Sequence, residues 1–324
     1  MFFYLQEVLS LKMFFNKNSM ITIFTPTYNR AYIIGKLYQS LCKQTCQDFE
    51  WLIVDDGSTD NTESIIKSYN EENKIVIRYH KQENGGKHTA INKAMNLAEG
   101  ELFFIVDSDD LLADDAVETI IDDWEKVKAE GLCGISYLRG YADGKVIGHS
   151  FPKERSVDNF IELRVNKGVS GDKAEVWETN KLRQYKFPIF PGEKFIGEGY
   201  LWYQLGLRYD MLFVNKVIYI CEYLDDGLTK SGKKMRIQNP LGGIATSLMQ
   251  MNPRSRFTYR LKKGLLYVVY SFFANRSIKD MMGCKYKSFI IPCIPFGWIL
   301  YKYWDYKYNE NITYYIYGKL ELNS

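Results

Sequence analysis

The chain has 324 residues, of which 46% are apolar and 25% are charged, and its formal net charge is +3. This is the composition of a globular protein with one large domain or two smaller ones, and so small a net charge excludes a general nucleic-acid binder. No run approaches the ~20 apolar residues needed to cross a bilayer. The opening MFFYLQEVLSLKMFF is interrupted by Gln6, Glu7 and Lys12, which disfavours a signal peptide. The six cysteines show no zinc-type spacing, so we expect reduced thiols in the cytoplasm.

Residues 20–110 alternate short apolar runs with amphipathic segments. We expect strands at 21–25, 51–54, 74–80 and 102–106, with helices at 31–44, 58–69 and 87–99 between them. Strands separated by helices pair in parallel, so their carboxyl ends lie on one edge of the sheet, where ligands of open α/β sheets bind. The pattern predicts a mostly parallel, Rossmann-like sheet whose edge gathers Pro26-Thr27, Asp55-Asp56 and Asp107-Ser108-Asp109.

After Asp110 the pattern changes. We expect a helix at 114–131, a hairpin around Asp143-Gly144 within 137–151, and a helix that begins near Glu198. The segment EYLDDGLTKSGKKMR, residues 222–236, is polar and contains glycines, so it predicts a mobile loop.

The acidic cluster after the fourth expected strand predicts a metal site. In extended backbone, residues two apart point the same way, so Asp107 and Asp109 can offer oxygens on one side. Magnesium and manganese take oxygen ligands and often use one or two carboxylates together with substrate phosphates. The alternative for Asp107 and Asp109 is an acidic turn that caps a helix.

Four segments carry a resemblance to a known family. TPTYNR, WLIVDDGSTDNT, ENGGKHTAINKAMNLAEGE and FFIVDSDD, in this order and spacing, resemble family 2 glycosyltransferases of the GT-A fold. The resemblance covers residues 20–223, and no segment is specific alone. It implies a nucleotide-sugar-binding half at 20–115 and an acceptor-binding half at 116–238. The sequence itself predicts a short amphipathic arm or a start-codon artefact at 1–19, and a basic, aromatic helical extension at 239–324.

The resemblance also implies roles for individual residues. Asp107 and Asp109 would hold manganese or magnesium, and Asp56 would accept a hydrogen bond from the base of a UDP-sugar. The other implied nucleotide-binding residues are Pro26, Thr27, Tyr28, Arg30, Asp55, Gly86, Lys87 and Ser108. Alternatives remain, namely turn capping by Asp55-Asp56 and a purely structural role for Tyr28, His88 or Asn92.

The implied reaction is displacement at the anomeric carbon of a sugar, with a nucleoside diphosphate leaving. Glu198 in FIGEGYLW is the best match for the base, and a single base opposite the leaving group predicts inversion. Many relatives have Asp or Glu-Asp here, whereas Gly199 fills the second position in this chain. Glu193 is the second candidate, and a structural Glu198 favoured by a helix dipole is the alternative.

Two basic segments lie in the C-terminal third of the chain. Lys230, Lys233, Lys234 and Arg236 predict either a lid over the diphosphate or a solvated loop. Residues 254–324 contain twelve basic and four acidic residues, with Trp298, Tyr301 and Trp304 among them. They predict either a segment on the anionic inner face of the cell membrane or a helical subdomain.

The sequence predicts transfer of one sugar at a time to a glycan or lipid-linked glycan, because the Q-x-x-R-W motif of processive synthases is absent. Two rivals stay open. A sugar-phosphate nucleotidyltransferase would have a glycine-rich basic loop after the first strand, which TPTYNR lacks. A catalytically inactive sugar-nucleotide-binding protein would tolerate the loss of Asp109 or Glu198.

Overall fold

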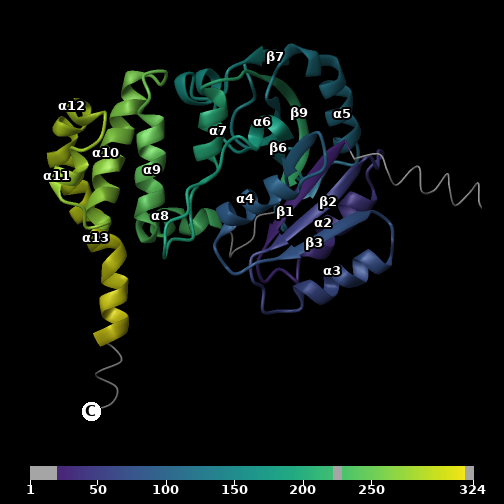
Figure 1. The fold of residues 1–324 in the computed structure, drawn as a ribbon, viewed down its shortest axis with the longest axis horizontal. Helices are drawn as coiled ribbons and strands as arrows, with labels where there is room; N and C mark the ends of the chain where they lie inside the picture. The colour runs from purple at the N-terminus through teal and green to yellow at the C-terminus, as the bar shows by residue number, and fades with distance from the viewer. Residues whose placement is uncertain (1–19, 222–227, 318–324) are drawn as a thin grey trace, which may run out of the picture. The chain divides into compact units, whose positions relative to one another are not determined.

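The computed structural model describes residues 20–221 and 228–317 (Figure 1). The chain divides into two compact units. The first consists of Met1–Asn159, Val169–Lys186 and Tyr209–Tyr223, and the second of Phe160–Gly168, Phe187–Arg208 and Leu224–Ser324. The predicted arm at 1–19 lies outside the described residues. The segment 116–238, predicted to bind the acceptor, contributes to both units.

The first unit is a nine-stranded sheet with helices. Its strands are β1 Ile21–Thr27, β2 Phe49–Asp55, β3 Val76–Lys81, β4 Leu102–Ile105, β5 Leu111–Leu112, β6 Gly134–Tyr141, β7 Arg155–Asp158, β8 Lys173–Glu178 and β9 Met211–Cys221. Its helices are α2 Ile34–Cys42, α3 Thr62–Glu71, α4 Lys87–Leu97, α5 Ala116–Val127 and α6 Thr179–Leu182, and a 3₁₀ turn spans Lys128–Glu130. The strand order is β3-β2-β1-β4-β8-β6-β9-β5, with β7 paired to β9.

The first four strands are parallel, as their alternation with helices predicts. β1 lies between β2 and β4, and β2 also pairs with β3. The register places Thr27 opposite Asp55, and Phe24 opposite Ile105, so the carboxyl ends of these strands share one edge. Beyond β4 the sheet is mixed, because β8 is antiparallel to both β4 and β6. The predicted α/β fold class is confirmed.

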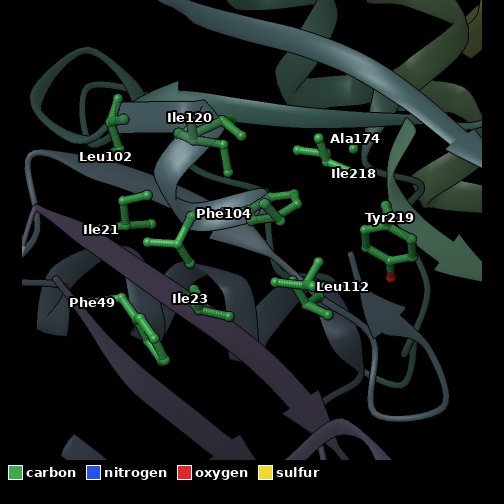
Figure 2. Packing of buried hydrophobic residues seen from close by; sticks show 14 of the residues in the cluster. Ile21, Ile23, Phe49, Leu102, Phe104, Leu112, Ile120, Ala174, Ile218 and Tyr219 are labelled. Carbon is green, nitrogen blue, oxygen red and sulfur yellow. The ribbon is translucent and has the colours of Figure 1, made fainter. Parts of the chain in front are cut away.

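The core of this unit explains the apolar strands. Every residue of β2 and β4 is buried, as expected for strands covered on both faces. Figure 2 shows Phe104 of β4 packed between β1 residues such as Ile21 and β9 residues such as Tyr219. The rings of Phe104 and Tyr219 meet edge to face with centroids 6.1 Å apart. The end of β4 is therefore held rigidly from both sides.

The predicted hairpin at 137–151 is only partly correct. The turn at Asp143-Gly144 forms, but the returning segment makes a single antiparallel bridge, between Gly140 and Val146. The reason is that β6 already pairs with β8 on one side and with β9 on the other. All six cysteines are unpaired, as expected.

The second unit is helical. A π-helical segment spans Ile161–Asn166, and the helices are α7 Gly199–Gly206, α8 Leu228–Gln238, α9 Pro240–Gln250, α10 Phe257–Phe273, α11 Ile278–Met281, α12 Lys287–Ile290 and α13 Ile294–Tyr317, with a 3₁₀ turn at Ile291–Cys293. α9 packs against α7 and α10, and α10 packs against α13. Their own apolar core includes Met251, Tyr267 and Val268. Within the described part of the chain, none of the helices combines the length and apolarity that crossing a bilayer requires.

The predicted mobile loop at 222–236 is wrong for its second part, because residues 228–238 form α8. Lys, Met, Arg and Gln are good helix formers, and together they outweigh Gly232. Ile237 is buried, so α8 also gains stability from packing. Asn239 and Pro240 follow the helix, consistent with the bias of a residue before proline away from helical backbone. Residues 222–227 lie outside the described residues.

Candidate active site

The carboxyl edge of the parallel strands carries a salt bridge between two predicted site residues. Lys87 is the first residue of α4, and its Nζ lies 2.5 Å from Oδ1 of Asp107, which follows β4. Both side chains are about seven-tenths buried, with exposed fractions of 28% and 29%. The fold therefore brings Lys87 and Asp107 together from segments 20 residues apart.

Asp107 and Asp110 are also held by β9. The amide of Asp107 donates to the hydroxyl of Tyr219 at 3.0 Å, and that hydroxyl donates to Oδ2 of Asp110 at 2.8 Å. Ser108 between them is buried. A tyrosine from the last strand thus fixes the backbone and one carboxylate of the turn.

Charges around the turn act on its carboxylates in opposite directions. Burial alone would raise the pKa of Asp107, but Lys87, Arg139 and Arg30 outweigh burial and lower it. Burial and the negative charge of Asp107 raise the pKa of Asp109. Burial and Asp107 also raise the pKa of Asp110, to about 7. These carboxylates repel one another, and a cation near Asp109 would relieve that repulsion.

Asp56 organises the glycine loop before α4. Its Oδ1 accepts hydrogen bonds from the Gln82 side chain and the amide of Gly85, and its Oδ2 accepts from the amide of Gly86 at 2.7 Å. Gly86 has φ +92°, a conformation that an L side chain would strain. The pair of glycines lets backbone amides reach Asp56 and positions Lys87. A carboxylate has roughly four acceptor sites, so Asp56 retains capacity for a ligand donor.

Asp55 has an internal role. It is fully buried, and its carboxylate accepts from the amide of Ser58 at 2.6 Å and from the hydroxyl of Tyr79 at 2.6 Å. Burial and this hydrogen bond raise the pKa of Tyr79. These contacts correspond to the turn-capping alternative for Asp55.

The loop after β1 carries the remaining nucleotide-site candidates. Tyr28 is 48% exposed, and Pro26 and Arg30 are partly buried. Asn29 adopts φ +52°, and its amide donates to the Ser58 hydroxyl, which ties this loop to the end of β2. The hydroxyl of Thr27 is buried, and none of the described residues hydrogen-bonds to it. A buried hydroxyl at a ligand edge without a protein partner is what a ligand contact would explain.

Glu198 and Glu193 belong to the second unit and differ in their contacts. Glu193 accepts from the amides of Leu241 and Gly242 at 2.7 and 2.8 Å, so it caps the start of α9. Glu198 immediately precedes α7, is partly buried and makes no capping hydrogen bond. Glu193 is therefore a helix cap, whereas Glu198 lies at the N-terminus of α7, as the helix-dipole alternative supposes, with no capping hydrogen bond from its side chain.

The predicted lid residues lie on α8. Lys233, Lys234 and Arg236 are exposed. The side chain of Lys230 lies outside the described part of the chain.

The residues present fit a divalent cation in part. Across residues 20–221 and 228–317, no cluster of three or more His, Cys, Asp and Glu side chains is placed to hold a metal. Asp107 and Asp109 nevertheless form a two-carboxylate set in which the positive charge of Lys87 already pairs with Asp107. Such a set suits a cation that completes its coordination with ligand phosphates.

Sequence reasoning missed two residues of this edge. Tyr219 lies on β9 and Arg139 on β6, with the guanidinium carbon 4.0 Å from the centroid of the Tyr219 ring. Both strands follow the region of strongest resemblance. No local signal in VIYIC or YLRGY marks them, because only the pairing of β9 with β6 brings them to the carboxylates.

Comparisons with known proteins agree with this architecture. The model of the family described as Glycosyl transferase family 2 matches residues 22–179. Glycosyltransferase GlyG of Streptococcus pneumoniae is 26% identical over 68% of this chain and 74% of its own length. The hyaluronan synthase of Pasteurella multocida is 35% identical over 43% of this chain. This chain spans 30% of S. pneumoniae GlyA and 14% of that synthase.

Solved structures share the fold. S. aureus TarS 1–349 in complex with UDP-GlcNAc superposes with a TM-score of 0.59 at 20% identity, covering 84% of this chain and 79% of that one. The Pyrobaculum calidifontis mannosyltransferase PcManGT, in complex with GDP-Man and Mn²⁺, has a TM-score of 0.54 at 16% identity over 88% of each chain. At these identities the likeness establishes the GT-A fold.

Proposed function

Because residues 22–179 form a family 2 glycosyltransferase domain, we propose that this protein transfers one sugar at a time from a nucleotide sugar to a glycan or lipid-linked glycan. The observation that carries the proposal is the convergence of Asp56, Lys87 and Asp107 on the carboxyl edge of the parallel strands. This edge is where open α/β sheets bind nucleotides.

A UDP-sugar is the proposed donor. TarS, which shares the fold, has been crystallised with UDP and with UDP-GlcNAc. In the proposed complex the free acceptor capacity of Asp56 receives the base N–H, and Tyr28 stacks on the base or ribose. The buried Thr27 hydroxyl gains its missing partner from the same nucleotide. The roles of Pro26, Arg30, Gly86 and Ser108 are proposed as supporting contacts of this pocket.

Asp107 and Asp109 are the proposed ligands of manganese or magnesium. When bound, such a cation neutralises charge that develops on the leaving diphosphate. PcManGT has been solved with Mn²⁺, which supports metal use on this fold. Lys87, already paired with Asp107, supplies a second positive charge toward the phosphates. Lys233 and Lys234 on α8 are proposed further contacts to the diphosphate.

Glu198 is the proposed base. It would accept the proton of the acceptor hydroxyl while that oxygen attacks the anomeric carbon and the bond to the diphosphate breaks. A base that acts on the face opposite the leaving group gives inversion. General bases contribute about 10²- to 10⁴-fold to rate. Glu193 is the weaker candidate, because both of its oxygens accept hydrogen bonds at the start of α9.

An anionic membrane surface is a proposed partner. The support is an exposed stripe along α13, formed by Phe296, Ile299, Tyr303 and Tyr306 at helical spacing and exposed by 54–66%. Lys302 is also exposed beside it. Aromatic residues together with lysine are typical of interfacial helices.

Nucleotide-dependent thermal stabilisation tests the transferase proposal. The panel is UDP, GDP, CMP and dTDP. We expect UDP to raise Tm, and only when manganese is present, because the phosphates would complete the coordination of the metal. Asp109→Ala should abolish the shift. Asp122→Ala, which removes an exposed carboxylate on α5, is the matched control and should keep the shift. No metal-linked shift with any nucleotide in the wild type would favour an inactive relative of the family.

A further inference from the structure

The second unit contains a pocket that the proposed chemistry has not used. It has a volume of about 150 Å³ and lies among residues 195–199, α8, α9 and α10. Arg236 and Lys263 are its charged lining residues, and none of the residues that line it is acidic. Two positive charges in a pocket without a carboxylate indicate that an anion would complete it.

Glycines build the walls of this pocket. A Cβ on Gly242 would lie 2.6 Å from the carbonyl oxygen of Phe195, and one on Gly243 would lie 2.5 Å from the ring of Tyr270. Both distances are shorter than any real Cβ contact, so α9 approaches its neighbours only because glycines stand here. The pocket is thus formed by close backbone packing and is shaped before a ligand arrives.

The charges of the pocket are uncompensated within the described part of the chain. No described carboxylate lies within 4.0 Å of the Lys263 ammonium or the Arg236 guanidinium. The ammonium of Lys263 lies 5.0 Å from the centroid of the Tyr259 ring. Burial, together with the charges of Lys262 and Arg236, lowers the pKa of Lys263 to about 8. A partly buried charge without a counterion is costly, and a bound anion would offset that cost.

Neutral groups of α9 add hydrogen-bonding capacity. Ser247 is 2% exposed and lines the pocket, and its hydroxyl has no hydrogen-bond partner among the described residues. The amide nitrogen of Gln250 makes one long hydrogen bond, at 3.4 Å, to the carbonyl of Gly199. An ammonium, a guanidinium, a hydroxyl and an amide around one small cavity match the several acceptor oxygens of a phosphate.

We propose that this pocket binds a phosphate group of the sugar acceptor. The inference rests on the proposed transferase function, since it names the acceptor class. Gly197 and Gly199 both line the pocket and flank Glu198, the proposed base, in the chain. A phosphate held by Arg236 and Lys263 would therefore anchor the acceptor beside the residue that activates its hydroxyl.

Calorimetric titration of inorganic pyrophosphate tests the pocket. The titration uses EDTA and no donor, so it does not depend on metal or on sugar transfer. We expect pyrophosphate to bind Lys263→Met and Arg236→Met at least about tenfold more weakly than it binds the wild type. Lys262→Met is the control, because Lys262 is exposed on the same helix as Lys263, and it should bind like the wild type. Equal affinity in all four proteins, no binding to the wild type, or complete displacement by UDP would each overturn the proposal.

A second measurement covers the case in which the variants do not fold. The affinity of the wild type for inorganic sulfate, whose own charge does not change in this range, should fall as the pH rises through about 8, where Lys263 loses its proton. The groups facing Lys263 do not titrate there, because Arg236 stays charged and burial raises the pKa of Tyr259 to about 12. Affinity that stays constant across this range would contradict a role for Lys263.

Vesicles identify the source of the phosphate. If phosphatidylcholine vesicles containing phosphatidic acid compete with pyrophosphate, and vesicles of phosphatidylcholine alone do not, the group belongs to a lipid-linked acceptor. If neither vesicle competes while pyrophosphate still binds, the group belongs to a soluble phosphorylated glycan. Either result keeps the phosphate site. Failure of Asp109→Ala to abolish nucleotide stabilisation would concern the transferase proposal alone.

Discussion

The hydroxyl of Tyr219 donates a hydrogen bond to the carboxylate of Asp110 at 2.8 Å, although the two residues are 109 positions apart. The same oxygen accepts from the amide of Asp107 at 3.0 Å. A residue of β9, the last strand, therefore fixes the acidic turn that follows β4. Rigidity at this turn matters for the proposed metal site, because the carboxylates of Asp107 and Asp109 would have to keep their positions through the reaction.

Tyr219→Phe tests this support. The variant keeps the ring between Phe104 and Arg139 but removes two buried hydrogen bonds, so we expect a loss of about 1–3 kcal/mol in the free energy of unfolding. Transfer rate should fall about tenfold or more, because the turn loses its fixed geometry. Tyr137→Phe is the matched control, since its buried hydroxyl donates to Asp123 on α5. Chemical denaturation and initial rates measure both; equal rate losses in the two variants would argue against a specific role.

Lys87→Met addresses the cation at the start of α4. We expect UDP affinity to fall about tenfold, which corresponds to ~1.4 kcal/mol, because a charge-assisted contact to phosphate is lost. Lys93→Met on the same helix is the control, as its ammonium donates to the carbonyl of Lys81 at an exposed position. Calorimetry with manganese and UDP gives both affinities. Unchanged UDP affinity in Lys87→Met would contradict a contact between Lys87 and the phosphates, and its ion pair with Asp107 would then be a structural contact.

The parallel half of the sheet was predictable from local pattern. Its strands are short and separated by amphipathic helices, all but the edge strand β3 are almost entirely buried, and polar residues follow each one directly. Lys87 and Asp107 could be expected near each other, because parallel topology alone places the end of β4 and the loop before α4 on one edge. The pattern did not predict the contacts of Asp56. The sequence indicated a ligand for a nucleotide base, whereas in the structure its carboxylate accepts hydrogen bonds from the glycine loop.

The remaining features depend on long-range pairing that a single sequence does not encode locally. Tyr219 and Arg139 reach the site only because β9 pairs in parallel with β6. Glu193 was separable from Glu198 only once its contact with α9 was seen. The pocket lined by Arg236 and Lys263 could not be predicted, because Arg236 lies on α8, and the glycine and charges of that segment had indicated a loop.

Glu198→Gln and Glu193→Gln separate the two candidate bases. If Glu198 is the base, its substitution should lower kcat by about a hundredfold or more, with little change in the free energy of unfolding. Glu193→Gln should instead destabilise the protein by about 0.5–2 kcal/mol, because a helix cap is weakened, and should leave kcat close to that of the wild type. Steady-state kinetics and urea denaturation distinguish them. A full rate in Glu198→Gln would remove this residue from the mechanism.

Phe296→Ser combined with Ile299→Ser tests whether the exposed apolar stripe of α13 contacts a membrane. Each exposed apolar side chain that enters a bilayer interface can contribute on the order of 1 kcal/mol, so we expect binding to anionic vesicles to weaken by about tenfold or more. Ile189→Ser is the control, because Ile189 is 66% exposed and lies outside the stripe. Vesicle flotation measures the bound fraction. Equal flotation of the double variant and the wild type would contradict membrane contact through this face.

Lys263 makes a prediction about stability that needs no ligand. Its pKa is about 8 in the folded protein and ordinarily 10.5, so between these values the unfolded chain binds more protons. The stability of the wild type should therefore gain with rising pH in this window, and the destabilising effect of the charged lysine is fully present below about 8. Lys263→Met removes that effect. We expect its advantage in Tm over the wild type to shrink as the pH rises from about 8 toward 10.5, whereas the difference between Lys262→Met and the wild type should change much less. Parallel Tm curves for Lys263→Met and the wild type would show that Lys263 carries no uncompensated charge, and the anion pocket would lose its main support.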